Sequence, residues 1–308
     1  ALIDKDAIYS AEGNASITSS LQVIGQIVAY AGEYGISTNP ESFAVYGYRK
    51  YFTDKKRGAV LRLSRDGMTE ISSYGMHDFF RDELADATKV VGGWNSHTKD
   101  YVLSLQTNSD YKTATFDEGV LGWTSFSSYK PSHIFSLSNV FYTFNQDVDI
   151  NNNLGRLYQH YLGPYAKFYG VTYGSDVTIV LNSNPSVVKN FKTINYEGGP
   201  GWELESMVAS STDKTLPIGK YVFQENLASL ENQIWSNTFK KKEDKYFANL
   251  INNSPATNGE ILYGADMSGI KGFYSTVKMS ISPITQFDTS AIKKELFSVS
   301  SDVVESSY

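Results

Sequence analysis

Residues 43–72, FAVYGYRKYFTDKKRGAVLRLSRDGMTEIS, decide the fold class that the sequence predicts. The stretch reads as three short strands, Phe43–Thr53, Ala59–Leu63 and Met68–Ser72, rich in the aromatic and branched residues that favour sheets. Two turns separate them, Asp54–Gly58 and Ser64–Gly67, and the second carries the Asp-Gly pair typical of hairpins. Strands this short do not form a stable sheet alone, so we expect the meander to pack against further sheets.

Strand-sized runs continue along the chain at intervals of roughly 8–12 residues, the spacing of sandwiches, barrels and propellers. The cleanest is Lys271–Ile281, in which apolar and polar side chains alternate. One segment differs, because His77–Ala87 places Phe80 and Leu84 at helical spacing and predicts a helix. A single helical turn is also predicted over Ser186–Phe191. The predicted fold class is therefore mainly β, either propeller-like or built of stacked antiparallel meanders, with one or two short helices.

A polar segment with three consecutive asparagines, Asp147–Asn153, is the predicted boundary within the chain. We expect residues 1–152 to form a propeller-like β-meander region. Residues 153–287 are expected to form a second β-rich region, either separate or a continuation of the same propeller. Residues 288–308 are serine-rich with few apolar anchors, so we expect an extended C-terminal arm that is ordered only across a neighbouring subunit.

Composition excludes several classes of protein. The chain has 308 residues, of which 41% are hydrophobic and 19% charged, which argues against disorder. A net charge of -6 without a long basic run argues against nucleic-acid binding. There is no cysteine, which excludes disulfides and thiolate metal sites, and no apolar run long enough to span a membrane. The chain begins at Ala1 without a signal peptide, and we expect it to be a piece of a longer protein.

The sequence predicts no catalytic, metal or cofactor site, and no cofactor. The four histidines do not lie at metal-ligand spacing; they are His77, His97, His133 and His160. Asp117 and Glu118 are adjacent at a strand end, where side chains point to opposite faces rather than toward one bond. Trp94 and Trp123 could stack on sugars, but aromatic residues in β-proteins more often pack between sheets.

Several stretches carry a resemblance to a known family. Residues 43–72 resemble a propeller blade of the NHL type, and three or four blade-sized units can be counted in the chain. Together with Asp176–Gly198, Phe239–Asn253 and the closing ELFSVSSDVVESSY, they are similar to large virion structural proteins of tailed bacteriophages, including marine and crAss-like phages. The resemblance implies that the chain is a C-terminal portion of such a protein. It also implies a tail role similar to that of the propeller-bearing nozzle or muzzle components.

We therefore expect a non-enzymatic structural component of a virion, a nozzle- or muzzle-like part of the tail or baseplate. It would act by assembly with other virion tail proteins and with its own copies in a ring. The alternative is a glycan-binding adhesin or a polysaccharide depolymerase domain, with a host surface glycan as partner. Carboxylates paired across a tyrosine-lined groove would favour the alternative, and extensive contacts on several faces would favour the structural component.

Overall fold

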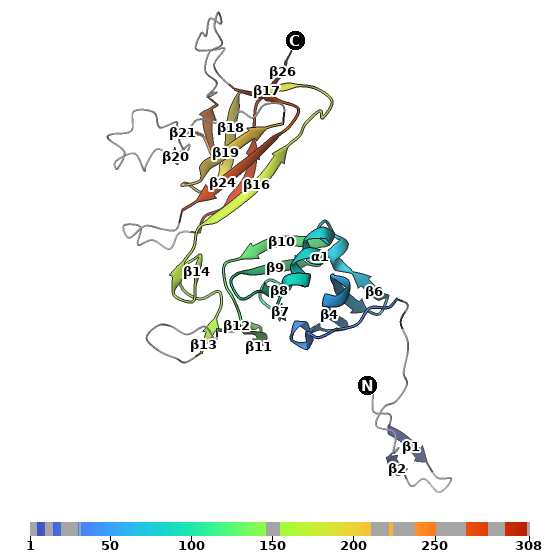
Figure 1. Cartoon of the computed structure of the whole chain (residues 1–308). Helices are drawn as coiled ribbons and strands as arrows, with labels where there is room; N and C mark the ends of the chain where they lie inside the picture. Colours follow the sequence, from blue (N-terminus) through green and yellow to red (C-terminus); the bar gives the residue numbers. More distant parts are fainter. Residues whose placement is uncertain are drawn as a thin grey trace, which may run out of the picture. The chain divides into compact units, whose positions relative to one another are not determined.

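The computed structural model describes residues 5–9, 15–19, 30, 32–145, 155–210, 222–223, 238–250, 269–282 and 293–306. The chain divides into two compact units, unit 1 (Ala1–His160) and unit 2 (Tyr161–Tyr308), and the colour bar of Figure 1 allows each to be followed. The segment Asp147–Asn153, predicted as a boundary, lies outside the described residues.

The opening stretch of the sequence folds as a four-stranded antiparallel meander in unit 1. Its strands are β3 (Ala44–Tyr46), β4 (Arg49–Asp54), β5 (Ala59–Ser64) and β6 (Gly67–Glu70), and each pairs with the next. The prediction of a single first strand over Phe43–Thr53 is wrong, because Gly47 and Tyr48 form a two-residue loop between β3 and β4. Gly47 has φ +56°, a positive value that tight hairpin loops need and that glycine adopts without strain.

Helix α1 (His77–Asp86) connects this first sheet to a second four-stranded meander. The strands of the second sheet are β7 (Lys89–Asn95), β8 (Asp100–Gln106), β9 (Tyr111–Asp117) and β10 (Gly122–Ser127), again paired in chain order. The predicted helix is confirmed, and its Phe80 and Leu84 are fully buried. They share one core with Tyr51 of the first sheet and Leu103 of the second, so the helix joins both sheets (Figure 1). Short 3₁₀ helices fill the connections: η1 (Pro40–Ser42), η2 (Lys55–Arg57) and η3 (Ile71–Ser73).

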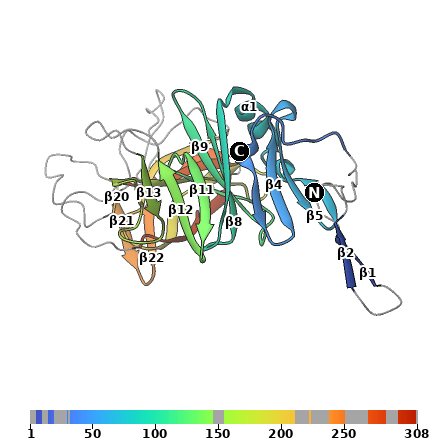
Figure 2. The ribbon, with the colours of Figure 1, turned by 90° about the horizontal axis from the view of Figure 1, so that it is seen from below.

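A third sheet in unit 1 lies against the second (Figure 2). It is formed by β11 (His133–Leu137), β12 (Val140–Asn145) and β13 (Arg156–Gln159). The close approach depends on Gly93, because a Cβ there would lie 2.2 Å from Cγ2 of Ile134 on β11. Nearer the N-terminus, β1 (Lys5–Tyr9) and β2 (Ala15–Ser19) pair as an antiparallel hairpin.

Unit 2 is a sandwich of two sheets around a second core. One sheet has the order β16-β24-β19, formed by β16 (Ser175–Leu181), β24 (Ser275–Ile281) and β19 (Glu203–Ala209). The other has the order β20-β21-β22-β18-β25, formed by β20 (Val222–Phe223), β21 (Thr238–Lys242), β22 (Lys245–Asn249), β18 (Thr193–Gly198) and β25 (Leu296–Ser300). Met207 and Val277 from the first sheet meet Tyr196 and Phe239 from the second in one buried cluster. Two small sheets complete the unit: β14 (Lys167–Phe168) with β15 (Val171–Thr172), and β23 (Ile270–Gly272) with β17 (Lys189–Phe191) and β26 (Val303–Glu305).

The C-terminal segment differs from the extended arm expected across a neighbouring subunit. In the structure β25 pairs with β18 and β26 pairs with β17, so the last described residues belong to the sheets of their own unit. Leu296 and Val299 pack against the core of unit 2. The segment has few apolar residues, but they are sufficient to order it within its own unit. The backbone hydrogen bonds of the β18–β25 and β17–β26 ladders add to their contacts. The helical turn predicted over Ser186–Phe191 is likewise replaced at its end by β17.

The mainly β fold class is confirmed, in the form of several antiparallel sheets with one α-helix among the described residues. The pairing of β20 with β21 is parallel. Among these residues no sheet closes on itself, and no ring of blades is present. No helix in the described part of the chain is long and apolar enough to cross a membrane.

Candidate functional site

Of the two tryptophans that could stack on sugars, Trp94 belongs to the core of unit 1 and Trp123 is partly buried against it. Trp94 is 7% exposed, and its ring stacks on Tyr46 at 4.2 Å and on Tyr51 at 5.5 Å between centroids. Trp123 packs against Phe80 at 4.4 Å, and its indole N–H donates to the carbonyl of Ile71 at 3.0 Å. The Trp94 ring thus links the second sheet to the first, and the Trp123 ring links the second sheet to α1. Packing between elements is the role that aromatic residues more often have in β-proteins.

Glu118, the second residue of the Asp117–Glu118 pair, links the first two sheets. Its carboxylate accepts hydrogen bonds from the Tyr51 hydroxyl at 2.6 Å and from Arg62 at 2.9 Å. Asp117 instead accepts a hydrogen bond from the backbone N–H of Gly119 at 2.5 Å, which closes the β9–β10 turn. Burial and the hydrogen bond to Glu118 both raise the pKa of Tyr51, because each disfavours the phenolate form. The two carboxylates thus have separate structural partners.

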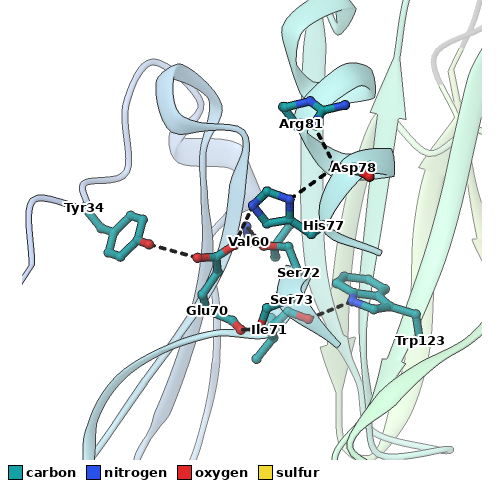
Figure 3. A network of polar contacts seen from close by, with 10 residues as sticks. All are labelled: Tyr34, Val60, Glu70, Ile71, Ser72, Ser73, His77, Asp78, Arg81 and Trp123. Carbon is teal, nitrogen blue, oxygen red and sulfur yellow. Dashed lines mark hydrogen bonds and ion pairs between the residues drawn. The ribbon is translucent and has the colours of Figure 1, made fainter. Parts of the chain in front are cut away.

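A polar network surrounds Glu70 at the end of the first sheet (Figure 3). The Glu70 carboxylate accepts hydrogen bonds from the Tyr34 hydroxyl at 2.8 Å and from the Ser72 hydroxyl at 2.9 Å. The Ser72 hydroxyl in turn accepts from the backbone N–H of Val60 at 3.2 Å. His77 Nε2 lies 3.9 Å from Glu70, at the start of α1. Through these contacts the network links three parts of unit 1: the segment before the first sheet, strand β5 and the start of α1.

The histidines remain separate in the structure. His77 lies beside acidic side chains on the surface, whereas His160 is partly buried, with Nε2 2.7 Å from the Thr143 hydroxyl. His133 is exposed on β11, and His97 lies in the turn between β7 and β8. Within the described ranges, no group of three or more potential ligand side chains could hold a metal ion.

A pocket of about 310 Å³ opens at one end of the second sheet in unit 1. Its walls are the start of β7, the end of β8 with the turn that follows, and the segment that leads into β11. Seven polar residues line it: Thr88, Lys89, Gln106, Thr107, Asn108, Lys130 and Ser132. The lining contains two ammonium groups and neither a carboxylate nor an aromatic ring. No sequence pattern predicts this pocket, because its residues come from three separate segments and follow no local motif.

Unit 2 presents an apolar side chain on the edge strand β25. The pairing of β25 with β18 shifts by one residue, so that Phe297 lies opposite no residue of β18. Such a bulge turns a side chain out of the regular alternation. Phe297 is 72% exposed, the highest value among the exposed large hydrophobic residues of β25 and β26. An exposed edge with an outward aromatic residue is a surface typical of protein–protein contacts.

Residues 163–253 match a family model, the Crassvirus muzzle protein C-terminal domain. The match lies within unit 2 and runs from before β14 to just after β22. Strands β24 and β25 follow the matched residues in sequence, yet they pair with β16, β19 and β18 inside the same sandwich. No curated protein matches the sequence. The match confirms the resemblance to virion proteins of crAss-like phages, and it indicates a virion component.

Proposed function

We propose that the chain is an assembly subunit at the distal end of a phage tail, in a muzzle-like position and without enzymatic activity. The observation that carries the proposal is the match of residues 163–253 to the muzzle protein C-terminal domain, on a unit with its own folded core. In this position the chain binds other virion tail proteins and copies of itself in a ring. Cyclic symmetry fits such a role, since a head-to-tail contact repeated by rotation closes into a ring.

The surface that we assign to this assembly is the β25 edge of unit 2. Edge strands carry unpaired backbone N–H and C=O groups on one side, and these can pair with a strand of another subunit. Phe297 adds an aromatic side chain that a partner surface can bury. Leu296 and Val299 hold the same strand to the core of its own unit, so the edge is presented by a fixed scaffold.

The location is tested on intact particles. Antibodies raised against the chain and carrying gold particles should label the distal end of the tail in electron micrographs. Gold label on the capsid, or intact virions that do not contain the protein, would contradict the proposal. Loss of the gene product should leave particles with incomplete tails.

The assembly surface is tested with a matched pair of neighbouring substitutions. We expect Phe297→Asp to lower incorporation of the protein into tails by about tenfold or more, because it puts a charge in an apolar contact. Ser298→Asp, at the next and also exposed position, is the control and should assemble with smaller loss. Both variants should keep the melting temperature of the parent. Equal incorporation of the two variants would exclude Phe297 from the interface.

The depolymerase form of the alternative requires two carboxylates facing one glycosidic bond. The described pocket contains none, and Asp117 and Glu118 have separate structural partners. We therefore propose that the purified protein does not cleave surface polysaccharides at neutral pH. Cleavage that disappears on replacement of one carboxylate would overturn this proposal.

A further inference from the structure

We propose that the polar pocket at the end of the second sheet binds an anionic saccharide unit, one sugar ring that carries a carboxylate or a phosphate. This is a recognition function beyond assembly, and it would let a virion component hold an acidic surface polysaccharide. The pocket lies in unit 1, outside the matched residues 163–253. Its volume of about 310 Å³ lies at the lower end of the range for small-ligand sites, which suits one ring rather than a long chain.

Positive charge in the pocket selects an anion. Lys89 and Lys130 both line it, and no acidic side chain does. The ammonium of Lys89 makes no hydrogen bond or ion pair with any other residue in the described part of the chain, and it is only partly exposed. An ammonium held at a concave, partly desolvated surface forms a stronger charge-assisted hydrogen bond than one in free solvent. A carboxylate or phosphate oxygen is the natural acceptor for it.

One of the lining residues is a buried glutamine. Gln106 is 5% exposed, and its amide nitrogen donates to the Ser104 hydroxyl at 3.1 Å and to the Pro131 carbonyl at 2.6 Å. Both amide hydrogens are therefore used, which fixes the orientation of the amide and leaves its carbonyl oxygen as an acceptor. The contact with Pro131 also ties the segment before β11 to the end of β8, so two walls of the pocket are held together.

The rim is fixed by hydrogen bonds as well. The backbone N–H and the hydroxyl of Thr88 donate to the backbone carbonyl of Gln106 at 2.8 and 3.0 Å. The Thr107 hydroxyl donates to the carbonyl of Asp110 at 3.1 Å and accepts from its backbone N–H at 2.9 Å, which closes the turn that carries Asn108. The pocket is thus preformed, and a ligand would not have to order it on binding.

A saccharide fits the remaining groups better than a simple anion. The Asn108 amide has no hydrogen-bond partner in the described part of the chain, and it supplies both a donor and an acceptor. Together with the side-chain amide oxygen of Gln106, it matches sugar hydroxyls, each of which also donates and accepts. Inorganic phosphate would also use the ammonium groups, but its one or two P–O–H groups can pair with fewer of the neutral polar groups than the several hydroxyls of a sugar ring can.

The test is calorimetric titration of the full chain with four probes at equal ionic strength. We expect glucuronate or glucose 6-phosphate to bind, and neutral glucose to bind at least tenfold more weakly. The better of the two charged sugars identifies the acidic group. Inorganic phosphate should also bind at least tenfold more weakly than that sugar. Phosphate that binds as tightly as the better sugar, or the absence of binding by both charged sugars, would overturn the proposal.

Two variants locate the binding. Lys89→Gln should weaken binding of the charged sugar by about 5–10-fold through loss of the charge-assisted hydrogen bond. Lys56→Gln, at an exposed lysine in η2, is the charge-matched control and should bind like the parent. Equal affinities of the two variants would place the sugar elsewhere and overturn the assignment of this pocket. The titration uses protein in solution, so its outcome does not depend on whether tail assembly fails.

Discussion

Gly58 follows η2, and Gly67 is the first residue of β6 after the Arg65-Asp66 loop. Both have positive φ, but their surroundings differ. Gly67 has φ +106°, and a Cβ there would meet no atom within 4 Å. The cost of a side chain at Gly67 is therefore one of backbone strain alone. We expect Gly67→Val to lower the free energy of unfolding by about 1–3 kcal/mol, and Gly67→Asn to lower it less, because asparagine tolerates positive φ better. Urea unfolding monitored by circular dichroism measures both, and equal losses would contradict this account of the turn.

Gly58 provides the comparison for this prediction. It has φ +64°, and a Cβ there would lie 2.8 Å from Cα of Arg81 on α1. Gly58→Ala should thus destabilise the protein more than Gly67→Ala, since it adds a collision with the helix backbone to the strain. The reverse order would mean that the helix can move away from the turn.

His160 makes the stability of unit 1 depend on pH. Burial among Tyr129 and Phe141 lowers its pKa to about 4, well below the value of about 6.5 expected in the unfolded chain. Between these two values the unfolded chain binds a proton that the folded chain does not, so stability falls as the pH drops. The contribution is fully present above about pH 6.5, and we expect a loss of about 1–3 kcal/mol by pH 4. Urea unfolding of the parent and of His160→Gln at pH 7.5 and 4.5 measures the difference.

A control histidine separates this effect from general acid destabilisation. His133 is exposed on β11, and His133→Gln should keep the pH dependence of the parent. His160→Gln should reduce it. A parent and a His160→Gln variant with the same pH dependence would show that burial of this imidazole does not limit stability in acid.

At the scale of elements, the C-terminal strands β25 and β26 are part of the unit 2 sheets. We expect removal of residues 293–308 to lower the melting temperature of unit 2, because it exposes one side of β18 and removes the contacts of Leu296 and Val299. A deletion that leaves the melting temperature unchanged would mean that these residues form a separate arm.

Two neighbouring substitutions measure the contribution of the buried side chain. Partial burial of Leu296 or Val299 is worth about 1 kcal/mol or more. Leu296→Ala should therefore destabilise unit 2 by about 1–2 kcal/mol, whereas Phe297→Ala, at an exposed position, should change stability by less than about 0.5 kcal/mol.

Local patterns in the sequence were sufficient for some elements. The helical spacing of Phe80 and Leu84 predicts α1, and the alternation in Lys271–Ile281 predicts β24, whose Val277 and Met279 are fully buried. These signals depend on a few neighbouring residues, and the structure confirms them. The hairpin at Gly47 was missed because aromatic residues continue across it and hide the turn.

Other features depend on residues far apart in the sequence. The hydroxyl of Ser300 donates to the side-chain oxygen of Asn195, and the two residues are 105 positions apart in the sequence. No local sequence pattern predicts such a pairing. The polar pocket has the same origin, since Lys89, Gln106 and Lys130 come from three segments. Topology brings these groups together, and topology is what a single sequence specifies least directly.

At the scale of the whole molecule, each unit has a hydrophobic core of its own. In unit 1 the largest cluster surrounds α1 and contains Leu84, and in unit 2 the cluster lies between the two sheets and contains Leu204. Both leucines have 0% exposure, so their truncation should leave comparable cavities. We propose that the units are separate folding domains, and a pair of matched substitutions distinguishes this from a single cooperative fold.

Differential scanning calorimetry of three proteins provides the measurement. Leu84→Ala and Leu204→Ala should each lower the free energy of unfolding by about 2–5 kcal/mol, because each removes buried methyl groups and leaves a cavity. If the units unfold independently, Leu84→Ala lowers only the transition of unit 1, and Leu204→Ala lowers only that of unit 2. Because each transition then belongs to a smaller domain, a shift of several degrees is expected for each kcal/mol lost. If either substitution moves all of the heat absorption together, the two cores form one cooperative unit and the division at His160 and Tyr161 is geometric only.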